Sequence, residues 1–333
     1  MFIDIYTHIF PEKFFARWQT YGQKLANIGK RMNAVKPLSD LDLRFRQMDG
    51  HGDYRQIVSL PNPPLEEIVD AATGAQLATM ANDTMAEVCR RHPDRFGGFV
   101  AAVCLSDIDT AMQELNRAIG ELGAKGIQIF TNIKGEPLDL PKYRPIFAAM
   151  AQHDLPIWLH PTRPNTMPDY ATEPRSRYEM WWAFGWPYET SVAMMRLVFD
   201  GLFDRHPAIK IITHHAGGMI PFFAARADAG LAHLGSRTSD EDYSKVLPSL
   251  KRPHGEYLKM FYADTAMFGK DGYIGTKAGL EYFGADKMVF STDAPFGPIG
   301  ETFAVLDRLG LERAAAEKIF QANAEKLMNT RFK

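Results

Sequence analysis

The sequence predicts an α/β fold, a single (β/α)8 barrel of the TIM type that extends over residues 1–333. Short apolar runs recur along the chain, and amphipathic helical stretches separate them. Most runs are continuously apolar rather than alternating, which is typical of parallel strands buried on both faces. Eight such strands with helices between them favour a barrel. The runs interpreted as strands are Phe2–Ile9, Gln56–Leu60, Phe96–Val103, Gly126–Phe130, Pro156–His160, Lys210–Thr213, Leu258–Tyr262 and Lys287–Ser291.

The stretches between these runs support the same fold. Residues 65–93 and 107–126 both have helical period, and the second begins at the capping residue Asp107 and ends at a glycine. A doubly wound open sheet is the alternative. Its dinucleotide-binding form requires a glycine-rich first turn, whereas residues 7–14 contain no glycine, so this alternative is disfavoured.

Two segments interrupt the regular alternation of strands and helices. Residues 11–48 form a long insertion after the first strand, and residues 161–186 form a long loop after the fifth strand, rich in aromatic residues and proline. Segments of this length inside a compact domain are usually functional lids or partner contacts.

Composition excludes several classes of function. The formal net charge is −2 and no basic tract is present, so nucleic acid is not an expected partner. Apolar runs stay below the roughly 18 residues that a membrane span requires. Cys89 and Cys104 are the two cysteines and do not form a C-x-x-C pair, so neither a disulfide framework nor a cysteine zinc site is predicted. We therefore expect a cytoplasmic protein.

Polar residues gather where the predicted strands end. In a barrel these carboxyl ends meet at one rim, which is where active sites lie. A single buried histidine often does no more than bond to a backbone carbonyl, but several histidines with one carboxylate suit Zn²⁺ or a similar divalent ion. The residues that end strands one, five, six, seven and eight are His8, His160, the pair His214 and His215, Asp264, and Asp293.

The first strand, within FIDIYTHIFP, raises a specific question. Asp4, Tyr6 and His8 alternate, so they are expected to project from one face of the strand. A strand that ends in Asp-x-His-x-His commonly begins a metal-dependent hydrolase, and here Tyr6 replaces the first histidine. Tyrosine ligates only as phenolate, and its reference pKa of about 10 makes that costly. We expect Tyr6 to be a weak ligand, a hydrogen-bonding neighbour of the ligands or a wall of the substrate pocket.

Several motifs together resemble a known family. The stretches IDIYTHIFPEKF, IWLHP, MFYADT and MVFSTDAPFG, with the block from Pro187 to Phe222, are similar to the amidohydrolase-2 branch of the amidohydrolase superfamily. Their order and spacing resemble the 2-amino-3-carboxymuconate-6-semialdehyde decarboxylases and related aromatic-acid decarboxylases. The likeness runs from residue 2 to the C-terminal IFQANAEKLM, and the block from Pro187 to Phe222 is its most specific part.

The resemblance implies a metal centre and its catalytic groups. His8, His160 and Asp293 would ligate one divalent metal, zinc or alternatively manganese. His215 matches the family histidine that is not a permanent ligand and handles the metal-bound water or a substrate proton, while His214 is expected to be structural. Asp264 matches the family's FYxDT motif and would orient groups at the rim by hydrogen bonds.

The resemblance also implies a substrate pocket. Arg31 lies about where the muconate enzymes keep an arginine for the substrate carboxylate, and Trp186 and Phe296 could form walls. The departure from the pattern is Tyr6, because the muconate decarboxylases have histidine there. Some benzoate decarboxylases carry glutamate or a non-ligating residue at this position, so it tolerates change.

Three hypotheses follow for function. The first is a metal-dependent non-oxidative decarboxylase, or carboxy-lyase, of an aromatic or unsaturated carboxylic acid, with Asp293 as the acid that protonates the carbon losing CO2. The second is a metal-dependent hydrolase or hydratase of a related ring-derived substrate at the same site. The third, a metal-free binding protein on a decayed barrel, rests on Tyr6 alone. Since related enzymes are often dimers, we expect a homodimer that binds a small carboxylic acid.

Overall fold

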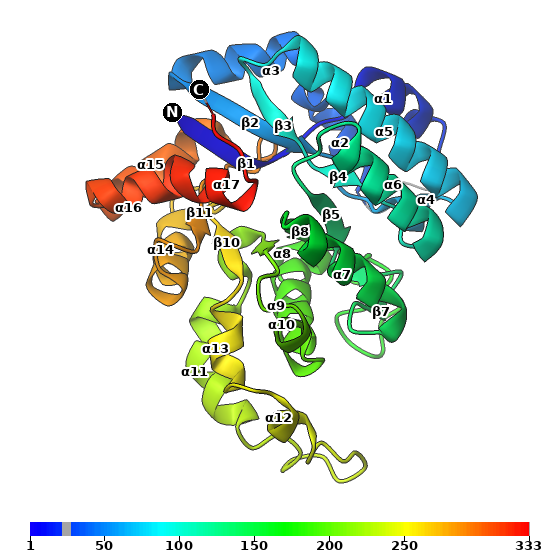
Figure 1. The fold of residues 1–333 in the computed structure, drawn as a ribbon, viewed down its shortest axis with the longest axis vertical. Coiled ribbons are helices and arrows are strands. Elements are labelled where there is room, and N and C mark those ends of the chain that lie inside the picture. Colours follow the sequence, from blue (N-terminus) through cyan, green and yellow to red (C-terminus); the bar gives the residue numbers. More distant parts are fainter. Residues whose placement is uncertain (22–27, 333) are drawn as a thin grey trace.

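A ring of parallel strands forms the centre of the computed structural model, which describes residues 1–21 and 28–332 (Figure 1). A strand overlaps each of the eight predicted runs, and the third run is divided into β3 and β4. Strand order is β1-β2-β3 in one ladder and β4-β5-β8-β9-β10-β11 in the other, with parallel pairing throughout both. The bounds are β1 Phe2–His8, β2 Tyr54–Ser59, β3 Phe96–Phe99, β4 Ala101–Ala102, β5 Ile127–Phe130, β8 Ile157–His160, β9 Ile211–Thr213, β10 Tyr262–Asp264 and β11 Met288–Val289.

Backbone hydrogen bonds join the two ladders into a barrel. On one side β3 continues into β4 through Val100, whose N–H donates to the carbonyl of Val58, 2.9 Å away. On the other side the N–H of Ile5 donates to the carbonyl of Phe290 at 3.0 Å, and the N–H of His8 donates to the carbonyl of Ala294 at 2.8 Å. The (β/α)8 barrel predicted from the sequence is therefore confirmed.

The interior of the barrel is apolar at the end opposite the rim. Ile5, Ile57 and Trp158 are fully buried in one cluster, and the Trp158 indole N–H donates to the carbonyl of Ile5 at 2.8 Å. Leu327 and Met328 from the C-terminal segment belong to the same cluster. Each fully buried side chain of this kind contributes about 1.5–3 kcal/mol, so the cluster anchors the strands that carry polar residues at the rim.

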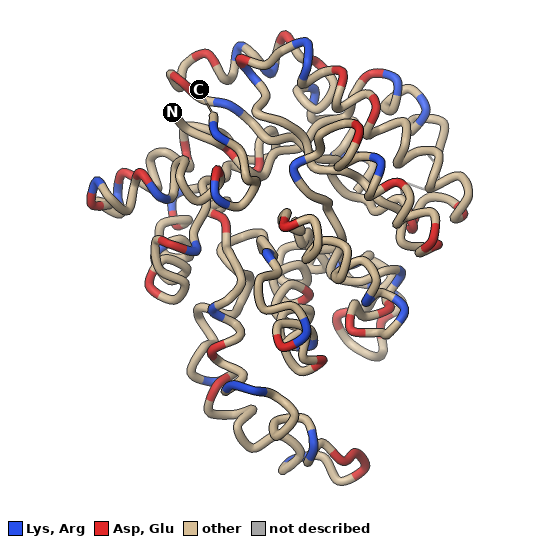
Figure 2. Tube along the Cα trace, in the orientation of Figure 1, with Lys and Arg blue, Asp and Glu red and all other residues tan. Residues whose placement is uncertain are grey.

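Helices surround the strands, and basic and acidic residues are interspersed along them (Figures 1 and 2). Among the described residues, no helix is long and apolar enough to cross a membrane. A small antiparallel hairpin, β6 Asn132–Ile133 with β7 Glu136–Pro137, follows β5. The larger helices are α1 Glu12–Gln19, α3 Leu41–Met48, α5 Ala71–Arg91, α6 Ile108–Gly120, α7 Arg144–His153, α9 Gly185–Phe199, α11 Ile220–Leu231, α14 Gly272–Phe283 and α15 Ile299–Leu309; the shorter ones are α2 Gly29–Ala34, α4 Leu65–Ile68, α8 Met180–Ala183, α10 Leu202–Arg205, α12 Val246–Ser249, α13 His254–Leu258, α16 Arg313–Glu317 and α17 Asn323–Leu327.

The seventh strand lies later than the sequence predicted. The run Leu258–Tyr262 was interpreted as a strand, but Leu258 is the last residue of α13 and β10 covers Tyr262–Asp264. Pro253 precedes this short helix, and Tyr257 and Leu258 are buried from it. A continuous apolar run is compatible with either element, and here the run is divided between a buried helix end and a strand.

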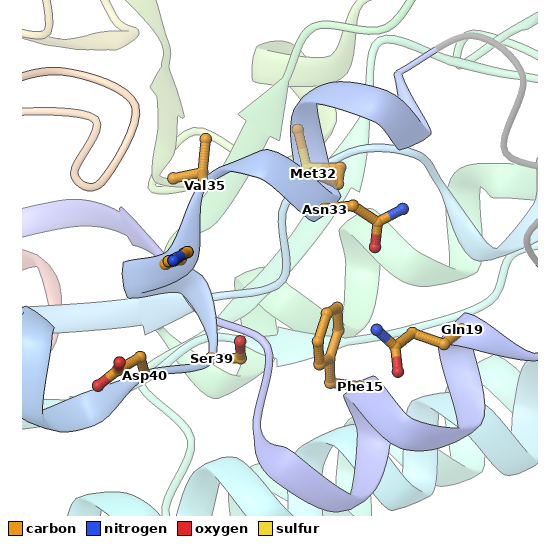
Figure 3. Close-up of a pocket in the computed structure, with 8 residues that line it drawn as sticks. Phe15, Gln19, Met32, Asn33, Val35, Ser39 and Asp40 are labelled. Atoms are coloured by element: carbon orange, nitrogen blue, oxygen red, sulfur yellow. The ribbon is translucent and has the colours of Figure 1, made fainter.

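The two irregular segments contain more helix than predicted. The insertion 11–48 contains helices α1, α2 and α3. Residues 22–27 lie outside the described part of the chain. A cavity of about 520 Å³ lies within this insertion, lined by side chains such as Phe15, Met32 and Asp40 (Figure 3). The loop predicted at 161–186 is irregular up to α8 and then leads into α9, while α11, α12 and α13 project as an arm (Figure 1).

Candidate active site

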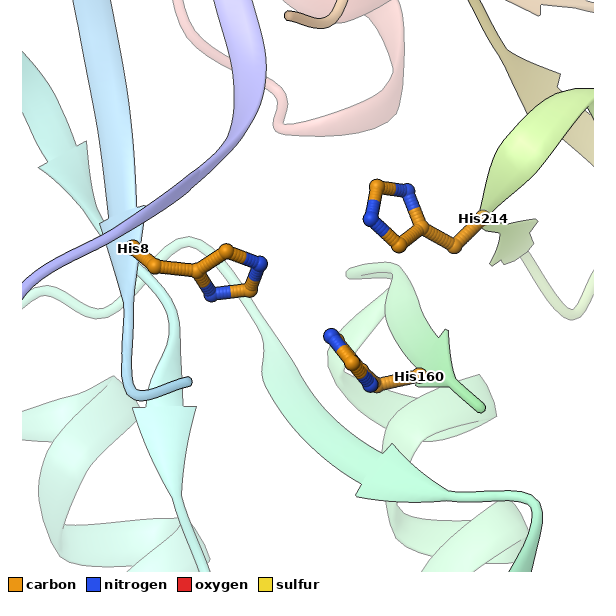
Figure 4. Close-up of side chains that lie close together, drawn as sticks. All are labelled: His8, His160 and His214. Carbon is orange, nitrogen blue, oxygen red and sulfur yellow. The ribbon is translucent and has the colours of Figure 1, made fainter. Parts of the chain in front are cut away.

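Three histidines converge at the carboxyl ends of three strands. His8 ends β1, His160 ends β8, and His214 follows β9 directly. Each has at least one ring nitrogen within 4.8 Å of those of the others, and their rings face a common space (Figure 4). Asp293, which follows β11, joins them: its Oδ1 lies 3.2 Å from His8 Nε2 and 3.4 Å from His214 Nε2. The structure thus brings these strand-end residues together in two overlapping groups, His8, His160 and His214, and His214, His215 and Asp293.

The two predicted metal ligands among the histidines are held by their Nδ1 atoms. His8 Nδ1 lies 3.3 Å from the carbonyl of Leu60, and His160 Nδ1 lies 2.8 Å from that of Pro161. A carbonyl accepts a hydrogen bond, so the tautomer with the proton on Nδ1 satisfies both contacts and leaves the Nε2 lone pair free. Metal-ligating histidines are usually oriented in this way.

The charges at this site fit a cation. Burial lowers the pKa of His8, and it lowers that of His160 well below the usual histidine value, so both rings are neutral at pH 7. Burial opposes ionisation of Asp293, but its interactions with His214 and His8 outweigh burial and hold the pKa of Asp293 well below its usual range. His8 Nε2 makes no hydrogen bond among the described residues, although it lies beside this carboxylate. A lone pair facing an anionic oxygen leaves room for a divalent metal ligated by both.

His214 occupies a position that the sequence reasoning did not expect. The resemblance implies a structural role for His214, and the structure places it fully buried among the site residues. Its Nδ1 is hydrogen-bonded to Asp264 Oδ2, which directs Nε2 toward Asp293. Burial alone would lower its pKa, yet the charges of Asp264 and Asp293 raise it to about 10. The carboxylate at the end of β10 was the signal that could have identified His214.

Asp264 is placed as an orienting residue. Its second oxygen accepts the backbone N–H groups of Ala216 at 3.3 Å and Ala266 at 3.1 Å, so both oxygens are engaged. His215 is the next residue after His214 and is partly exposed. Burial lowers its pKa to about 4, and its ring stacks 6.4 Å from that of Trp186.

Comparison with known proteins agrees with this architecture. The family model for amidohydrolases matches residues 3–329 of the chain. The chain belongs to the amidohydrolase family. It is 32% identical over 302 residues to gamma-resorcylate decarboxylase of Rhodococcus jostii (strain RHA1), with 86% of each chain covered. It is 28% identical over 317 residues to 2-amino-3-carboxymuconate-6-semialdehyde decarboxylase of Dictyostelium discoideum, covering 90% of this chain and 82% of that one.

A solved structure of the amidohydrolase family supports the same comparison. The dihydroxybenzoic acid decarboxylase from Polaromonas sp. JS666, which holds manganese and the inhibitor 2-nitroresorcinol, superposes with a TM-score of 0.78. The sequence identity is 28%, and the alignment covers 98% of this chain and 96% of that one. The amidohydrolase fold and its relation to the aromatic-acid decarboxylases, both inferred from sequence motifs, are confirmed.

Tyr6 packs against the amidohydrolase histidines. Its ring stacks on His214 with centroids 4.1 Å apart and lies 5.7 Å from the ring of His8. The hydroxyl is fully buried and lacks a hydrogen-bond partner among the described residues. Burial, with the charges of Asp264 and Asp293, raises the pKa of Tyr6 well above its usual value, which keeps the phenol neutral. A neutral phenol is a poor ligand, so these contacts favour a wall of the pocket.

The expected face that included Asp4 is broken by a register shift. The ladder between β1 and β2 slips between Asp4 and Thr7, so Asp4 does not follow Tyr6 and His8 into the site. Its carboxylate bonds instead to Tyr54 and Thr292. A bulge of this kind changes which side chains share a face, and neighbouring residue types do not reveal it.

Two of the predicted substrate contacts lie around the histidines of this amidohydrolase. Trp186 has its ring centre 5.7 Å from that of His160, and its indole N–H is buried without a partner in the described chain. The Arg31 guanidinium carbon lies 6.0 Å from the centre of the Phe296 ring, which in turn lies 5.6 Å from the ring of His8. The exposed Arg31 is thus one side chain away from the histidine cluster.

Proposed function

We propose that this protein is a metal-dependent non-oxidative decarboxylase of an aromatic carboxylic acid that carries a neighbouring oxygen. The observation that carries the proposal is the approach of His8 Nε2 to Asp293 Oδ1 at 3.2 Å, where two acceptors face each other beside His160. The similarity to gamma-resorcylate decarboxylase supports the reaction class. It also favours a hydroxybenzoate over a muconate as substrate, because the muconate-semialdehyde decarboxylase is less similar to this chain.

His8, His160 and Asp293 would hold one divalent metal. When bound, the metal supplies a Lewis acid that binds the substrate oxygens and stabilises negative charge developing on them. Two imidazoles with one carboxylate suit either zinc or manganese. The manganese bound in the Polaromonas relative supports manganese for this chain.

Asp293 would deliver the proton that replaces CO2. The ring carbon that bears the carboxylate gains a proton, its bond to the carboxylate carbon then breaks, and the electrons of that bond remain on the ring. Asp293 is ionised at rest and must first acquire a proton. His214, whose Nε2 lies 3.4 Å from Asp293 Oδ1, is placed to supply it. Proton transfer from a positioned group of this kind typically contributes 10²–10⁴-fold to the rate.

The remaining residues would bind the substrate. We assign to His215 a contact with a substrate oxygen, because its neutral ring lies between His214 and Trp186. Trp186 and Tyr6 would form walls for a flat ring. Arg31 would pair with a carboxylate or phenolate at the entrance, since it stacks on the phenyl ring that contacts His8.

Release of CO2 from a panel of acids tests this function. We expect the metal-loaded protein to release CO2 from one or more dihydroxybenzoates, tested beside monohydroxybenzoates and carboxymuconates, and to lose that activity after chelation. Reconstitution with Mn²⁺ and with Zn²⁺ in parallel decides which metal supports turnover. Headspace CO2 and the decarboxylated product are measured together in each reaction.

A hydrolase or hydratase remains the alternative that uses the same cluster. In that case the metal would activate water, and His215 or Asp293 would take up its proton. Hydrolysis or hydration of ring-derived esters, lactones or alkenes without CO2 release would contradict the decarboxylase. Less than about a tenth of an equivalent of divalent metal in purified protein would contradict both and favour a binding protein.

We further propose a cytoplasmic homodimer. Large apolar side chains are exposed on α8, α9 and the projecting α11, among them Trp182, Tyr188 and Phe222. A surface patch of exposed apolar side chains commonly marks an interface between proteins. Two unpaired cysteines, Cys89 and Cys104, are compatible with a reducing compartment. Sedimentation velocity should give twice the chain mass, and a monomer at micromolar concentration would contradict the dimer.

A further inference from the structure

A buried chain of hydrogen bonds connects a cation on α3 with an anion on β1. Arg44 Nε donates to Gln56 Oε1 at 2.7 Å, and Gln56 Nε2 donates to the hydroxyl of Tyr54 at 2.9 Å. The Tyr54 hydroxyl then donates to Asp4 Oδ2. Each of the four side chains is at most 3% exposed. Because every donor points the same way, the dipoles are aligned from the guanidinium toward the carboxylate.

The two ends of this chain bind the backbone beside two proposed metal ligands. At one end, Arg44 Nη1 donates to the carbonyl of His8 at 2.5 Å. At the other end, Asp4 accepts the backbone N–H of Thr292 at 3.1 Å and the Thr292 hydroxyl at 2.5 Å. Thr292 directly precedes Asp293. The network therefore binds the chain at His8 and at the residue before Asp293, and the side chains of His8 and Asp293 meet at 3.2 Å.

Burial makes this network energetically unfavourable for its ionisable groups. Burial raises the pKa of Asp4 to about 7 and lowers that of Arg44 to about 10, so both groups are strongly desolvated. Well-packed apolar residues often stabilise a fold as much as a buried charged network does. Removing one member leaves its partners buried without a hydrogen bond, which is unfavourable. Such networks restrict geometry more than they add stability.

We propose that Arg44, Gln56, Tyr54 and Asp4 are positioning residues that set the separation of His8 and Asp293 and thereby the affinity for the divalent metal. This inference rests on the proposed assignment of these two residues as ligands. None of the four is among the residues proposed to hold the metal or the substrate. Groups that orient metal ligands typically contribute 10–100-fold to metal affinity.

Replacement of Tyr54 by phenylalanine tests the proposal, because it removes the central hydroxyl and keeps the ring. We expect Tyr54→Phe to bind Mn²⁺ and Zn²⁺ about 10–100-fold more weakly than the wild-type protein. Affinity is measured on metal-free protein by competition with a chromophoric chelator, so the result does not depend on turnover. A thermal melt of the metal-free protein is recorded for each variant.

Tyr257→Phe is the matched control. The Tyr257 hydroxyl also donates to a carboxylate, that of Asp204, and the residue is 2% exposed compared with 3% for Tyr54. It lies on α13, outside the network. Both variants lose a tyrosine–aspartate hydrogen bond, which is buried at Tyr54 and partly buried at Tyr257, so both should melt earlier, but only Tyr54→Phe should bind metal more weakly.

A second pair of variants keeps the test decisive if Tyr54→Phe does not fold. Thr292→Val removes the hydroxyl that Asp4 accepts and should weaken metal binding, whereas Thr292→Ser retains it and should restore the affinity. If each of Tyr54→Phe and Thr292→Val that folds binds metal as tightly as the wild-type protein, the positioning role is overturned. A wild-type protein that binds no divalent metal would instead overturn the proposed function, so the two failures are distinguishable.

Discussion

Asp293→Asn is expected to lower kcat by about 10³-fold or more while the protein remains folded. The amide removes the negative charge that faces His8 Nε2 and His214 Nε2, and it cannot carry a proton to the substrate carbon. The rate is measured as CO2 release from the acid identified in the panel. Metal content is determined on the same sample, so that loss of metal and loss of proton transfer are separated.

Asp307→Asn is the control for this experiment. Asp307 is an exposed residue on α15. Its replacement is the same change of an acid to an amide, outside the histidine cluster. It should have the rate and melting temperature of the wild-type protein. A rate close to wild type for Asp293→Asn, with metal bound, would remove Asp293 from the mechanism.

The adjacent histidines are expected to respond differently to replacement. His214→Asn should lower kcat by about 10²–10⁴-fold, because the imidazole that lies between Asp264 and Asp293 would no longer hold a proton for transfer. His215→Asn should mainly raise KM, since its ring stacks on that of Trp186, which we propose lines the substrate pocket. Steady-state kcat and KM are measured for both variants.

His233→Asn controls for the general effect of losing an imidazole, because His233 is exposed and lies just beyond the end of α11 in the projecting arm. It should have wild-type kinetics. The reverse pattern, with a large loss of kcat in His215→Asn and a small one in His214→Asn, would assign the proton transfer to His215, as the family motif implies.

Much of the fold was predictable because its signals are local. The apolar runs end in His8, His160 and Asp293, and parallel strands in a barrel place such ends at one rim. A strand that is buried on both faces needs a continuous apolar run, so strand positions could be inferred from composition alone. The misplaced strand near Leu258 shows the limit, since a buried helix end has the same composition.

The identity of the residues that meet at the site was less predictable. Two histidines in succession cannot be ranked by sequence, and it is the carboxylate of Asp264, 50 residues later, that directs His214 inward. The slip in register after Asp4 likewise depends on the pairing of β1 with β2. Both effects involve partners that are distant along the chain.

The sequence by itself determined the barrel, the family and the residues that end its strands. Both signals, the continuous apolar runs and the polar residues that follow them, lie in short contiguous segments of the chain. Only the tertiary structure decided that the ring of Tyr6 stacks on that of His214 and that Arg44 reaches the carbonyl of His8. These contacts join elements that are far apart in sequence. They depend on packing distances of a few ångströms that no local pattern specifies.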